Sequence, residues 1–330
     1  MERIGVLGAG TWGMALARVL SNAGHHVTVW SALEKEVEEF SATRVHPNLP
    51  GMEIPETIVF TKSIEEVCKD KEVLLFAVPS VFVRSTARNA APYIRDGQIV
   101  LDVAKGMEQT THLTMTQVIA DELKNPTVKL VAFSGPTHAE EVAKDLPTTI
   151  VAACEDLAVA EFVQTLFEGT CMRVYTNSDV FGVELCGAMK NVMALAAGIA
   201  AGIGYGDNTK AALITRGIAE IARLGVAMGC KTETFFGLTG IGDLIVTATS
   251  IHSRNNRCGM LLGQGVPPQE AVKQVGMVVE GINALPAAME LKEKYKVEMP
   301  LTEAVNAVVN EGASPVEQVQ ILMHRKIKAE

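Results

Sequence analysis

The chain has 330 residues, of which 48% are hydrophobic, and its formal net charge is -9 at pH 7. This length is enough for two domains, and the acidic balance without a long Lys/Arg cluster argues against a nucleic-acid-binding surface. The six cysteines are scattered without a C-x-x-C pair, which predicts buried thiols in a reducing compartment and no metal site.

The chain begins directly with a strand-like run, "MERIGVLGAG", so we expect no signal peptide. Its longest uncharged stretch, 192–206, is shorter than the ~20 apolar residues of a membrane helix and is rich in small residues. Such a stretch is typical of a tightly packed helix in a soluble protein. We therefore expect a cytoplasmic protein without a stable membrane anchor.

The first half of the chain alternates between strand-like and helix-like segments. The strand-like runs are RIGVLG, HVTVW, TIVF, EVLLFAV, QIVLDVA, KLVAFSG, TTIVAAC and MRVYT. Helix-like segments include 12–22, 33–42, 81–91 and 111–123. This alternation predicts an α/β, Rossmann-like domain over residues 1–180, with a mainly parallel sheet covered by helices on both faces.

After residue 177 the strand pattern stops and helical segments broken by Gly or Pro follow. We predict helices at 178–203, 207–229, 255–264, 267–275, 281–295 and 302–311, and a last one at "SPVEQVQILM". The run "LIVTAT" between them is strand-like. The pattern predicts an all-α C-terminal domain over residues 181–330, with enough apolar surface to support a homodimer.

The motif "VLGAGTWG" contains Gly8, Gly10 and Gly13 directly after a strand and at the start of a helix. The first glycine allows the turn, the second lets the backbone approach a pyrophosphate, and the third lets helix and strand pack closely. This context indicates a dinucleotide-binding domain, and a tight turn without a ligand is the alternative. The second strand ends at Trp30 and Ser31 without an acidic residue or an arginine, which leaves the choice between NAD and NADP open.

Two lysines, Lys105 and Lys190, are candidate catalytic residues. Lys105 in "DVAKGME" follows a strand at the same sheet edge as the glycine motif, although a surface lysine in a turn is the ordinary interpretation. Lys190 lies in the apolar, small-residue helix "ELCGAMKNVMALAAG", where its ammonium needs water or an anionic partner. Desolvation and a second lysine would lower its pKa and make it a usable proton donor. A buried structural salt bridge is the alternative.

Three further stretches suggest ligand contacts. "AFSGPTHAEE" forms a strand-to-helix junction without a nucleophile motif, so the backbone around Gly135 and Thr137 is a candidate ligand cradle. Arg254 and Asn255 precede a predicted helix and are candidates for holding an anion, unless they form an ordinary solvated helix start. Asp243 is expected to orient a lysine ammonium or to cap the run "LIVTAT". No histidine has an obvious partner, and we assign none a catalytic role.

The ordered set "GAGTWG", "AKG", "SGPTHAEE", "CGAMKN", "ALITRG", "GIGDLIVT", "SRN" and "VVEG" resembles the NAD(P)-dependent glycerol-3-phosphate dehydrogenase family, in particular its bacterial-type cytosolic form. The resemblance runs from the first strand to near the C-terminus. It implies reversible reduction of dihydroxyacetone phosphate to sn-glycerol 3-phosphate with NAD(P)H, which supplies glycerophospholipid synthesis. Many family members have a basic residue where this chain has Ser31 and Ala32.

The resemblance also implies the roles of individual residues. Lys190 would be the proton donor or acceptor at the C2 oxygen, and Lys105 would be a second catalytic residue that adds positive potential. The cofactor would contact Gly8, Gly10, Thr11, Trp12, Gly13, Ser31, Lys105, Ala139, Arg254, Val278 and Glu280. The substrate would contact Lys105, Gly135, Thr137, Lys190, Asp243, Ser253, Arg254 and Asn255. Two alternatives stay open: a reductase of another small oxo acid on the same two-domain plan, and a non-catalytic dinucleotide sensor.

Overall fold

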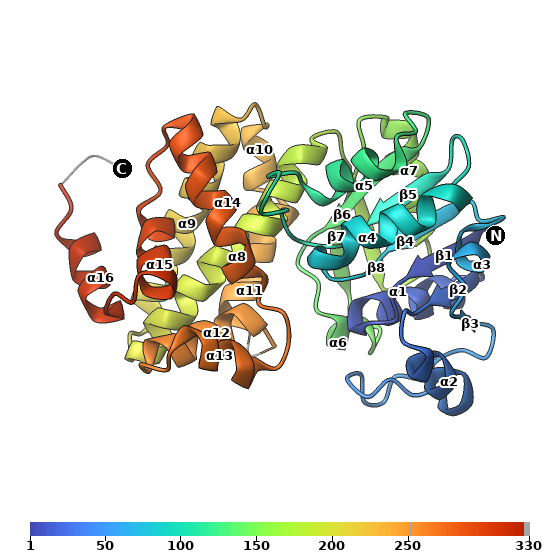
Figure 1. The fold of residues 1–330 in the computed structure, drawn as a ribbon, viewed down its shortest axis with the longest axis horizontal. Helices are drawn as coiled ribbons and strands as arrows, with labels where there is room; N and C mark the ends of the chain where they lie inside the picture. Colours follow the sequence, from blue (N-terminus) through green and yellow to red (C-terminus); the bar gives the residue numbers. More distant parts are fainter. Residues whose placement is uncertain (251, 327–330) are drawn as a thin grey trace. The chain divides into compact units, whose positions relative to one another are not determined.

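The computed structural model describes residues 1–250 and 252–326, and the chain forms two compact units. The first unit comprises Met1–Glu108 and Leu113–Glu184, and the second comprises Gln109–His112 and the chain from Leu185 onward. In Figure 1 the first unit is drawn mainly from blue to green and the second mainly from yellow to red.

The first unit is built on one sheet with the strand order β3-β2-β1-β4-β5-β6-β7-β8. The strands are β1 (Arg3–Leu7), β2 (His26–Trp30), β3 (Val59–Thr61), β4 (Val73–Phe76), β5 (Ile99–Asp102), β6 (Lys129–Ser134), β7 (Thr148–Ala153) and β8 (Met172–Asn177). Neighbouring strands are parallel except β6 and β7, which are antiparallel. The predicted mainly parallel, Rossmann-like sheet is confirmed.

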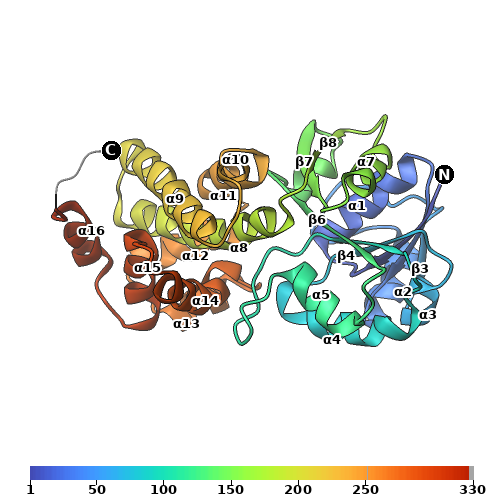
Figure 2. The ribbon, with the colours of Figure 1, turned by 90° about the horizontal axis from the view of Figure 1, so that it is seen from above.

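Helices cover both faces of this sheet, as Figure 2 shows for α4 and α5 on one side and α1 and α7 on the other. The helices of the first unit are α1 (Thr11–Asn22), α2 (Glu34–Thr43), α3 (Ile64–Cys68), α4 (Ser80–Ala90), the 3₁₀ turn η1 (Ala91–Tyr93), α5 (Met115–Leu123), α6 (Ala139–Val142) and α7 (Leu157–Thr165). Along β4, Val73 and Leu75 join one apolar core, whereas Leu74 and Phe76 join the other. A strand buried on both faces explains the continuous apolar run in the sequence.

The second unit is helical. Its helices are α8 (Val180–Ile203), α9 (Asp207–Ala227), α10 (Thr232–Phe235), the π-helical turn η2 (Leu238–Gly242), α11 (Asp243–Thr249), α12 (Arg254–Gly263), α13 (Pro268–Val275), α14 (Glu280–Tyr295), α15 (Pro300–Asn310) and α16 (Pro315–Met323). The first residues of α8 belong to the first unit by the division given above. The predicted all-α C-terminal domain is confirmed.

The strand-like interpretation of "LIVTAT" is wrong, because these residues form α11. The buried positions of this helix are Asp243, Leu244, Thr247 and Ala248. They recur at i, i+1, i+4 and i+5, which is the spacing of one helical face. Burial against neighbouring helices outweighs the β-propensity of the β-branched residues in this run.

The small residues of α8 allow another helix to approach it closely. A Cβ atom added at Gly198 would lie 2.2 Å from the Asn256 carbonyl oxygen, and one added at Gly202 would lie 2.2 Å from the Met260 carbonyl oxygen. The α8 backbone therefore contacts the α12 backbone directly. By length and composition α8 is apolar enough to cross a membrane, but 83% of its most apolar window is buried inside the structure. The expected tightly packed helix is confirmed.

Candidate active site

The turn between β1 and α1 has the shape that the glycine motif predicts. Gly8 has φ +123°, and a Cβ atom there would lie 2.7 Å from the Ala77 carbonyl oxygen. A Cβ atom at Gly13 would lie 2.3 Å from the Gly8 carbonyl oxygen, whereas one at Gly10 would meet no atom within 4 Å. Two of the glycines are therefore needed for packing, and Gly10 leaves open space above the helix start.

The start of α1, next to this open space, carries groups that can hold an anion. The N-cap of α1 is Gly10, which offers no side-chain acceptor to the first N–H groups of the helix. The indole Nε1 of Trp12 is a buried donor for which no hydrogen-bond partner is found in the described part of the chain. Thr11 is the first residue of α1 and is half-buried. These features fit the pyrophosphate of a dinucleotide, which would accept hydrogen bonds from such donors.

The end of β2 differs from the sequence-based expectation that no carboxylate lies there. The Ser31 hydroxyl is buried and donates a hydrogen bond of 2.6 Å to Oε2 of Glu36. Glu36 lies in the first turn of α2, five residues beyond Ser31, and the turn between them brings its carboxylate back to the strand end. That expectation is therefore wrong, because the chain turns back after the strand and brings a carboxylate of the next helix to the strand end.

The structure brings Lys105 together with the turn after β6. Nζ of Lys105 donates a hydrogen bond of 2.8 Å to the Gly135 carbonyl oxygen and lies 3.5 Å from the Thr137 hydroxyl. Thr137 in turn donates to the same Gly135 carbonyl at 3.2 Å. The helix that follows, α6, begins with the half-buried Ala139 and has four residues. The polar groups of this cradle therefore come chiefly from Lys105 and the turn.

Buried polar groups that the sequence analysis did not single out surround this region of the first unit. Asp102 ends β5 and accepts a hydrogen bond of 3.3 Å from the Ala104 N–H, one residue before Lys105. Burial, and secondly the charge of Glu184, raises the pKa of Asp102 well above its usual value. The Ser134 hydroxyl is also buried, and no partner is found for it among the residues described. Asp102 follows an apolar strand in "IVLDVAKG", a position that could have marked it.

In the second unit, Lys190 lies on α8 and is almost completely buried. Its Nζ donates to Oδ1 of Asp243 and to the Thr247 hydroxyl, both at 2.6 Å. Thr247 in turn donates to the Asp243 backbone carbonyl, one helical turn earlier, at 2.6 Å. This hydrogen bond agrees with the first role expected for Asp243, to orient a lysine ammonium, and Asp243 is also the first residue of α11. The rotamer of Lys190 is therefore set by two partners on α11.

The start of α12 carries the predicted anion-binding residues. The Ser253 side chain caps the helix by accepting from the Asn256 N–H at 3.2 Å, and Arg254, the first helical residue, is half-buried. The amide of Asn255 donates to Oδ1 of Asn191 and accepts from the Gly281 N–H, both at 2.9 Å. Much of the hydrogen-bonding capacity of Asn255 thus joins α12 to α8 and α14.

Val278 and Glu280 lie at the beginning of α14. Val278 is half-buried in the segment that precedes the helix, and Glu280 is the first helical residue. A Cβ atom at Gly281 would lie 2.5 Å from the Asn191 carbonyl oxygen, so α14 approaches the α8 backbone closely. Within the second unit, Asn191 is therefore contacted by the starts of both α12 and α14.

The six cysteines are free thiols. Burial raises the pKa of Cys68 to about 12 and that of Cys258 to about 11. Both thiols are therefore protonated and poorly nucleophilic at neutral pH. In residues 1–250 and 252–326, no group of three or more His, Cys, Asp or Glu side chains could hold a metal ion.

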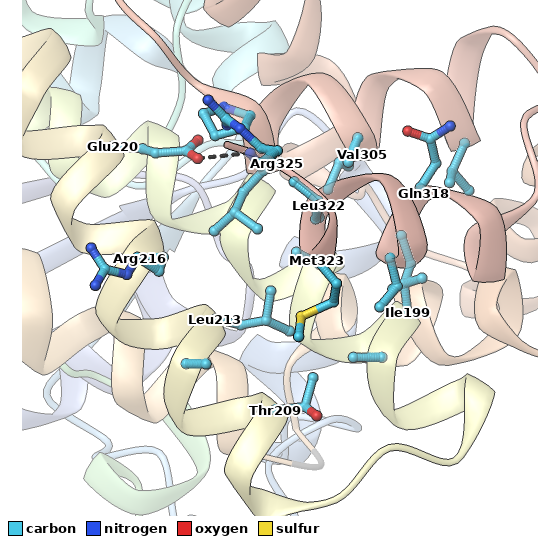
Figure 3. Close-up of a pocket in the computed structure, with 18 of the residues that line it drawn as sticks. Ile199, Thr209, Leu213, Arg216, Glu220, Val305, Gln318, Leu322, Met323 and Arg325 are labelled. Carbon is cyan, nitrogen blue, oxygen red and sulfur yellow. Dashed lines mark hydrogen bonds between the residues drawn. The ribbon is translucent and has the colours of Figure 1, made fainter. Parts of the chain in front are cut away.

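A cavity of about 810 Å³ lies elsewhere in the second unit, lined by residues of α8, α9, α15 and α16. Figure 3 shows Ile199, Leu213, Leu322 and Met323 around it. Buried Glu220 lies in its lining and accepts a hydrogen bond of 2.7 Å from the Leu301 N–H. None of the sequence-predicted site residues lines this cavity, so we do not assign it to the reaction.

The comparisons with known proteins cover both units. Residues 3–160 match the family model described as NAD-dependent glycerol-3-phosphate dehydrogenase N-terminus, and residues 179–320 match the C-terminus model of the same family. A protein of Lactobacillus delbrueckii subsp. bulgaricus named glycerol-3-phosphate dehydrogenase [NAD(P)+] 2 is 66% identical, over 100% of this chain and 99% of that protein.

A second relative, glycerol-3-phosphate dehydrogenase [NAD(P)+] of Agathobacter rectalis, is 53% identical over 100% of this chain and 98% of its own length. Among solved structures, glycerol-3-phosphate dehydrogenase from Coxiella burnetii superposes with a TM-score of 0.92 at 37% identity, and the match covers 98% of this chain and 99% of that one. The similarity therefore extends over at least 98% of each of these proteins.

Proposed function

Because the chain belongs to the NAD-dependent glycerol-3-phosphate dehydrogenase family, we propose that it catalyses the reversible NAD(P)H-dependent reduction of dihydroxyacetone phosphate to sn-glycerol 3-phosphate. The observation that carries this proposal is a lysine, Lys190, held by Asp243 and Thr247 in an otherwise apolar helix. The product is a precursor of glycerophospholipids, so the enzyme supplies their synthesis. The relatives at 66% and 53% identity are both named for glycerol 3-phosphate, which leaves another oxo acid or a sensor role without support.

The first domain, residues 1–180, is proposed to bind the dinucleotide, and residues 181–330 to bind substrate. The glycine turn, the start of α1 without a side-chain cap and the buried Nε1 of Trp12 support the first assignment. When bound, the reduced nicotinamide supplies a hydride to C2 of the ketone. The residues proposed to contact the cofactor are Gly8, Gly10, Thr11, Trp12, Gly13, Ser31, Lys105, Ala139, Arg254, Val278 and Glu280.

Lys190 is proposed to donate a proton to the C2 oxygen in the reductive direction and to accept it in the oxidative direction. Two hydrogen bonds fix its Nζ, so little side-chain freedom is lost when substrate binds. Asp243 balances the charge of the ammonium in a buried setting, which allows the charged form to exist there. Lys105 is proposed to add positive potential near the reacting oxygen.

Arg254 is proposed to hold the phosphate of the substrate, because a guanidinium can make two parallel hydrogen bonds to phosphate oxygens. The remaining Asn255 N–H and the N–H groups at the start of α12 are further donors. The full set of residues proposed to contact substrate is Lys105, Gly135, Thr137, Lys190, Asp243, Ser253, Arg254 and Asn255.

The direct test follows the absorbance of the reduced nicotinamide with NADH or NADPH, with and without dihydroxyacetone phosphate. We expect oxidation that depends on dihydroxyacetone phosphate and is far slower with unphosphorylated dihydroxyacetone. Tight dinucleotide binding without substrate-dependent oxidation would mean that the protein is a sensor. If dihydroxyacetone is turned over as fast as dihydroxyacetone phosphate, the proposal that Arg254 holds the substrate phosphate is wrong.

We also propose that the protein is a homodimer that associates through α16 and the cavity beside it. No residue of α16 is buried, and its apolar side chains Val316, Ile321 and Met323 are 43%, 59% and 78% exposed. A second copy would cover these side chains. Light scattering should give twice the chain mass, and Ile321→Asp with Met323→Asp should give a monomer. A wild-type monomer at micromolar concentration contradicts this proposal.

We propose a cytoplasmic location without a membrane anchor. The burial of α8 supports this proposal, since the most apolar helix is occupied in packing. Cell fractionation should recover the protein with the cytosol, and recovery with membranes after a high-salt wash would contradict it.

A further inference from the structure

The end of β2 carries a hydrogen-bonded pair, Ser31 and Glu36, of which Glu36 has no role in the function proposed above. Ser31 is 5% exposed, and its hydroxyl donates to Oε2 of Glu36 at 2.6 Å while accepting from the Leu33 N–H at 3.1 Å. The proton of this hydroxyl is thus directed at the Glu36 carboxylate. Ser31 therefore serves to hold Glu36, whose other carboxylate oxygen can accept a further hydrogen bond.

His46 is a buried residue next to the glycine turn. Its ring is 3% exposed, is stacked on Phe40 with 5.2 Å between ring centroids, and accepts from the Asn48 N–H at 3.2 Å. Burial lowers the pKa of His46, against the opposing effects of a hydrogen bond with the Ala9 backbone and the charge of Glu36. The ring therefore lies against the turn and near Glu36, and as a neutral group it leaves the charge of that carboxylate uncompensated.

Two cations near this strand end, Arg44 and Lys62, have other partners. Arg44 donates to the Ile58 carbonyl oxygen at 2.8 Å, and its guanidinium lies over the Phe60 ring, 5.4 Å from the centroid. Lys62, just beyond β3, forms an ion pair with Glu34. In this arrangement the Arg44 guanidinium and the Lys62 ammonium are each paired with groups of the protein.

In a Rossmann fold, the end of the second strand lies at the adenosine ribose of the cofactor. An acidic residue about 20 positions after the glycine motif accepts a hydrogen bond from the 2′-hydroxyl of NAD, and an arginine nearby accommodates the 2′-phosphate of NADP. Glu36 follows Gly13 at this spacing, although it comes from the first turn of the next helix and not from the strand itself.

We infer that Glu36, positioned by Ser31, accepts a hydrogen bond from the ribose 2′-hydroxyl of NADH and repels the 2′-phosphate of NADPH, so that this chain prefers NADH. This inference rests on the dinucleotide-binding part of the proposed function, because it requires a dinucleotide at the start of α1. The names of the relatives give the cofactor as NAD(P)+ and do not distinguish NAD from NADP. The inference chooses between the two. The Glu36 carboxylate affects both affinities. It strengthens NADH binding by a charge-assisted hydrogen bond and weakens NADPH binding by repulsion between like charges.

The test measures dissociation constants for NADH and NADPH separately, by energy transfer from tryptophan to the reduced nicotinamide. We expect the wild type to bind NADH about 10- to 100-fold more tightly, the range expected for one hydrogen bond to a charged group. Glu36→Gln should reduce this ratio about tenfold or more, because it weakens the binding of NADH and strengthens the binding of NADPH. Glu39→Gln, which removes an exposed carboxylate from the same helix, should leave the ratio unchanged.

Ser31→Ala tests the positioning role, since it frees Glu36 without removing its charge. We expect an intermediate ratio for Ser31→Ala and recovery of the wild-type ratio in Ser31→Thr, which keeps the hydroxyl. Loss of affinity for both dinucleotides by the same factor in Ser31→Ala would indicate a purely structural role for Ser31 and would overturn its part in the inference.

Equal affinities in the wild type, tighter NADPH binding, or an unchanged ratio in Glu36→Gln would each overturn the inference. If dihydroxyacetone phosphate is reduced equally well with both cofactors, the proposed function stands and only the cofactor preference fails. If neither dinucleotide binds, both fail. If NADH binds preferentially but dihydroxyacetone phosphate is not reduced, the inference stands and the proposed function fails.

Discussion

Lys190 and Asp243 lie 53 positions apart in the chain and form an ion pair with 2.6 Å between Nζ and Oδ1. Their side chains are only 6% and 1% exposed. The Thr247 hydroxyl completes the cluster by accepting from the same ammonium. A buried pair of this kind is costly to break, because removal of one partner leaves the other charge uncompensated.

Replacement of Lys190 by Ala should lower kcat by about 10²- to 10⁴-fold with little change in KM, because the proton donor is lost while the phosphate contacts stay. Steady-state kinetics with dihydroxyacetone phosphate at saturating NADH measures the effect. A large rise in KM with unchanged kcat would show that Lys190 binds substrate without donating the proton.

The same substitution should lower the free energy of unfolding by about 3–5 kcal/mol, because the buried carboxylate of Asp243 loses the cation that balances its charge. The double variant Lys190→Ala/Asp243→Asn should recover most of this stability without recovering kcat. Recovery of both in the double variant would assign Lys190 a structural role only, which is the alternative considered for it from the sequence.

Replacement of Arg254 by Ala should raise KM for dihydroxyacetone phosphate by about 10- to 100-fold, the range expected for a lost charge-assisted contact. The matched control is Arg257→Ala, which removes an exposed guanidinium one turn further along α12. A change confined to kcat, or an equal effect in both variants, would contradict the assignment of the phosphate to Arg254.

Substitutions of Gly10 and Gly13, in the turn after β1, should affect dinucleotide binding and stability differently. Gly10 has φ -70° and open space around an added Cβ atom, so Gly10→Ala should leave stability unchanged or raise it by up to about 1 kcal/mol while weakening dinucleotide binding. Gly13→Ala should destabilise the fold by about 1–3 kcal/mol, because its Cβ atom would lie 2.3 Å from the Gly8 carbonyl oxygen. Thermal denaturation and NADH titration of both variants check this contrast.

Glu220 should make stability depend on pH. Burial raises the pKa of Glu220 to about 7, although N–H groups at the start of α15 oppose the shift. Between the unfolded pKa of about 4.5 and the folded pKa, the folded state holds the proton that the unfolded state has released. The contribution of this residue is therefore full below about pH 4.5 and is lost as the pH rises towards 7, with a slope of up to about 1.4 kcal/mol per pH unit.

Denaturant unfolding at several pH values between 5 and 8 measures this slope. Glu220→Gln should flatten it, because the amide does not titrate in this range. An identical slope in the variant would mean that Glu220 is not the group responsible.

The eight strands, and the succession of an α/β domain and an all-α domain, could be predicted from the sequence. Both depend on the local periodicity of apolar residues. Apolar runs bounded by turn residues mark β1 to β8, and the glycine motif specifies the turn after β1 within a few residues. The exception was "LIVTAT", where β-branched residues indicated a strand and α11 formed instead. The helical spacing of its apolar residues is present in the sequence, but a run of seven residues is too short for this spacing to be recognised against the β-propensity of its residues. Only packing against neighbouring helices decides for the helix.

The amino-acid sequence by itself determined which residue types were available for chemistry, the fold class and the family resemblance. The tertiary structure decided which of them meet: Lys190 with Asp243, and Ser31 with Glu36. It also directed the side chain of Asn255 to Asn191 and Gly281. The physical reason is that strand and helix periodicity are set by neighbours in the chain, whereas these pairings depend on how helices pack and how a loop turns back.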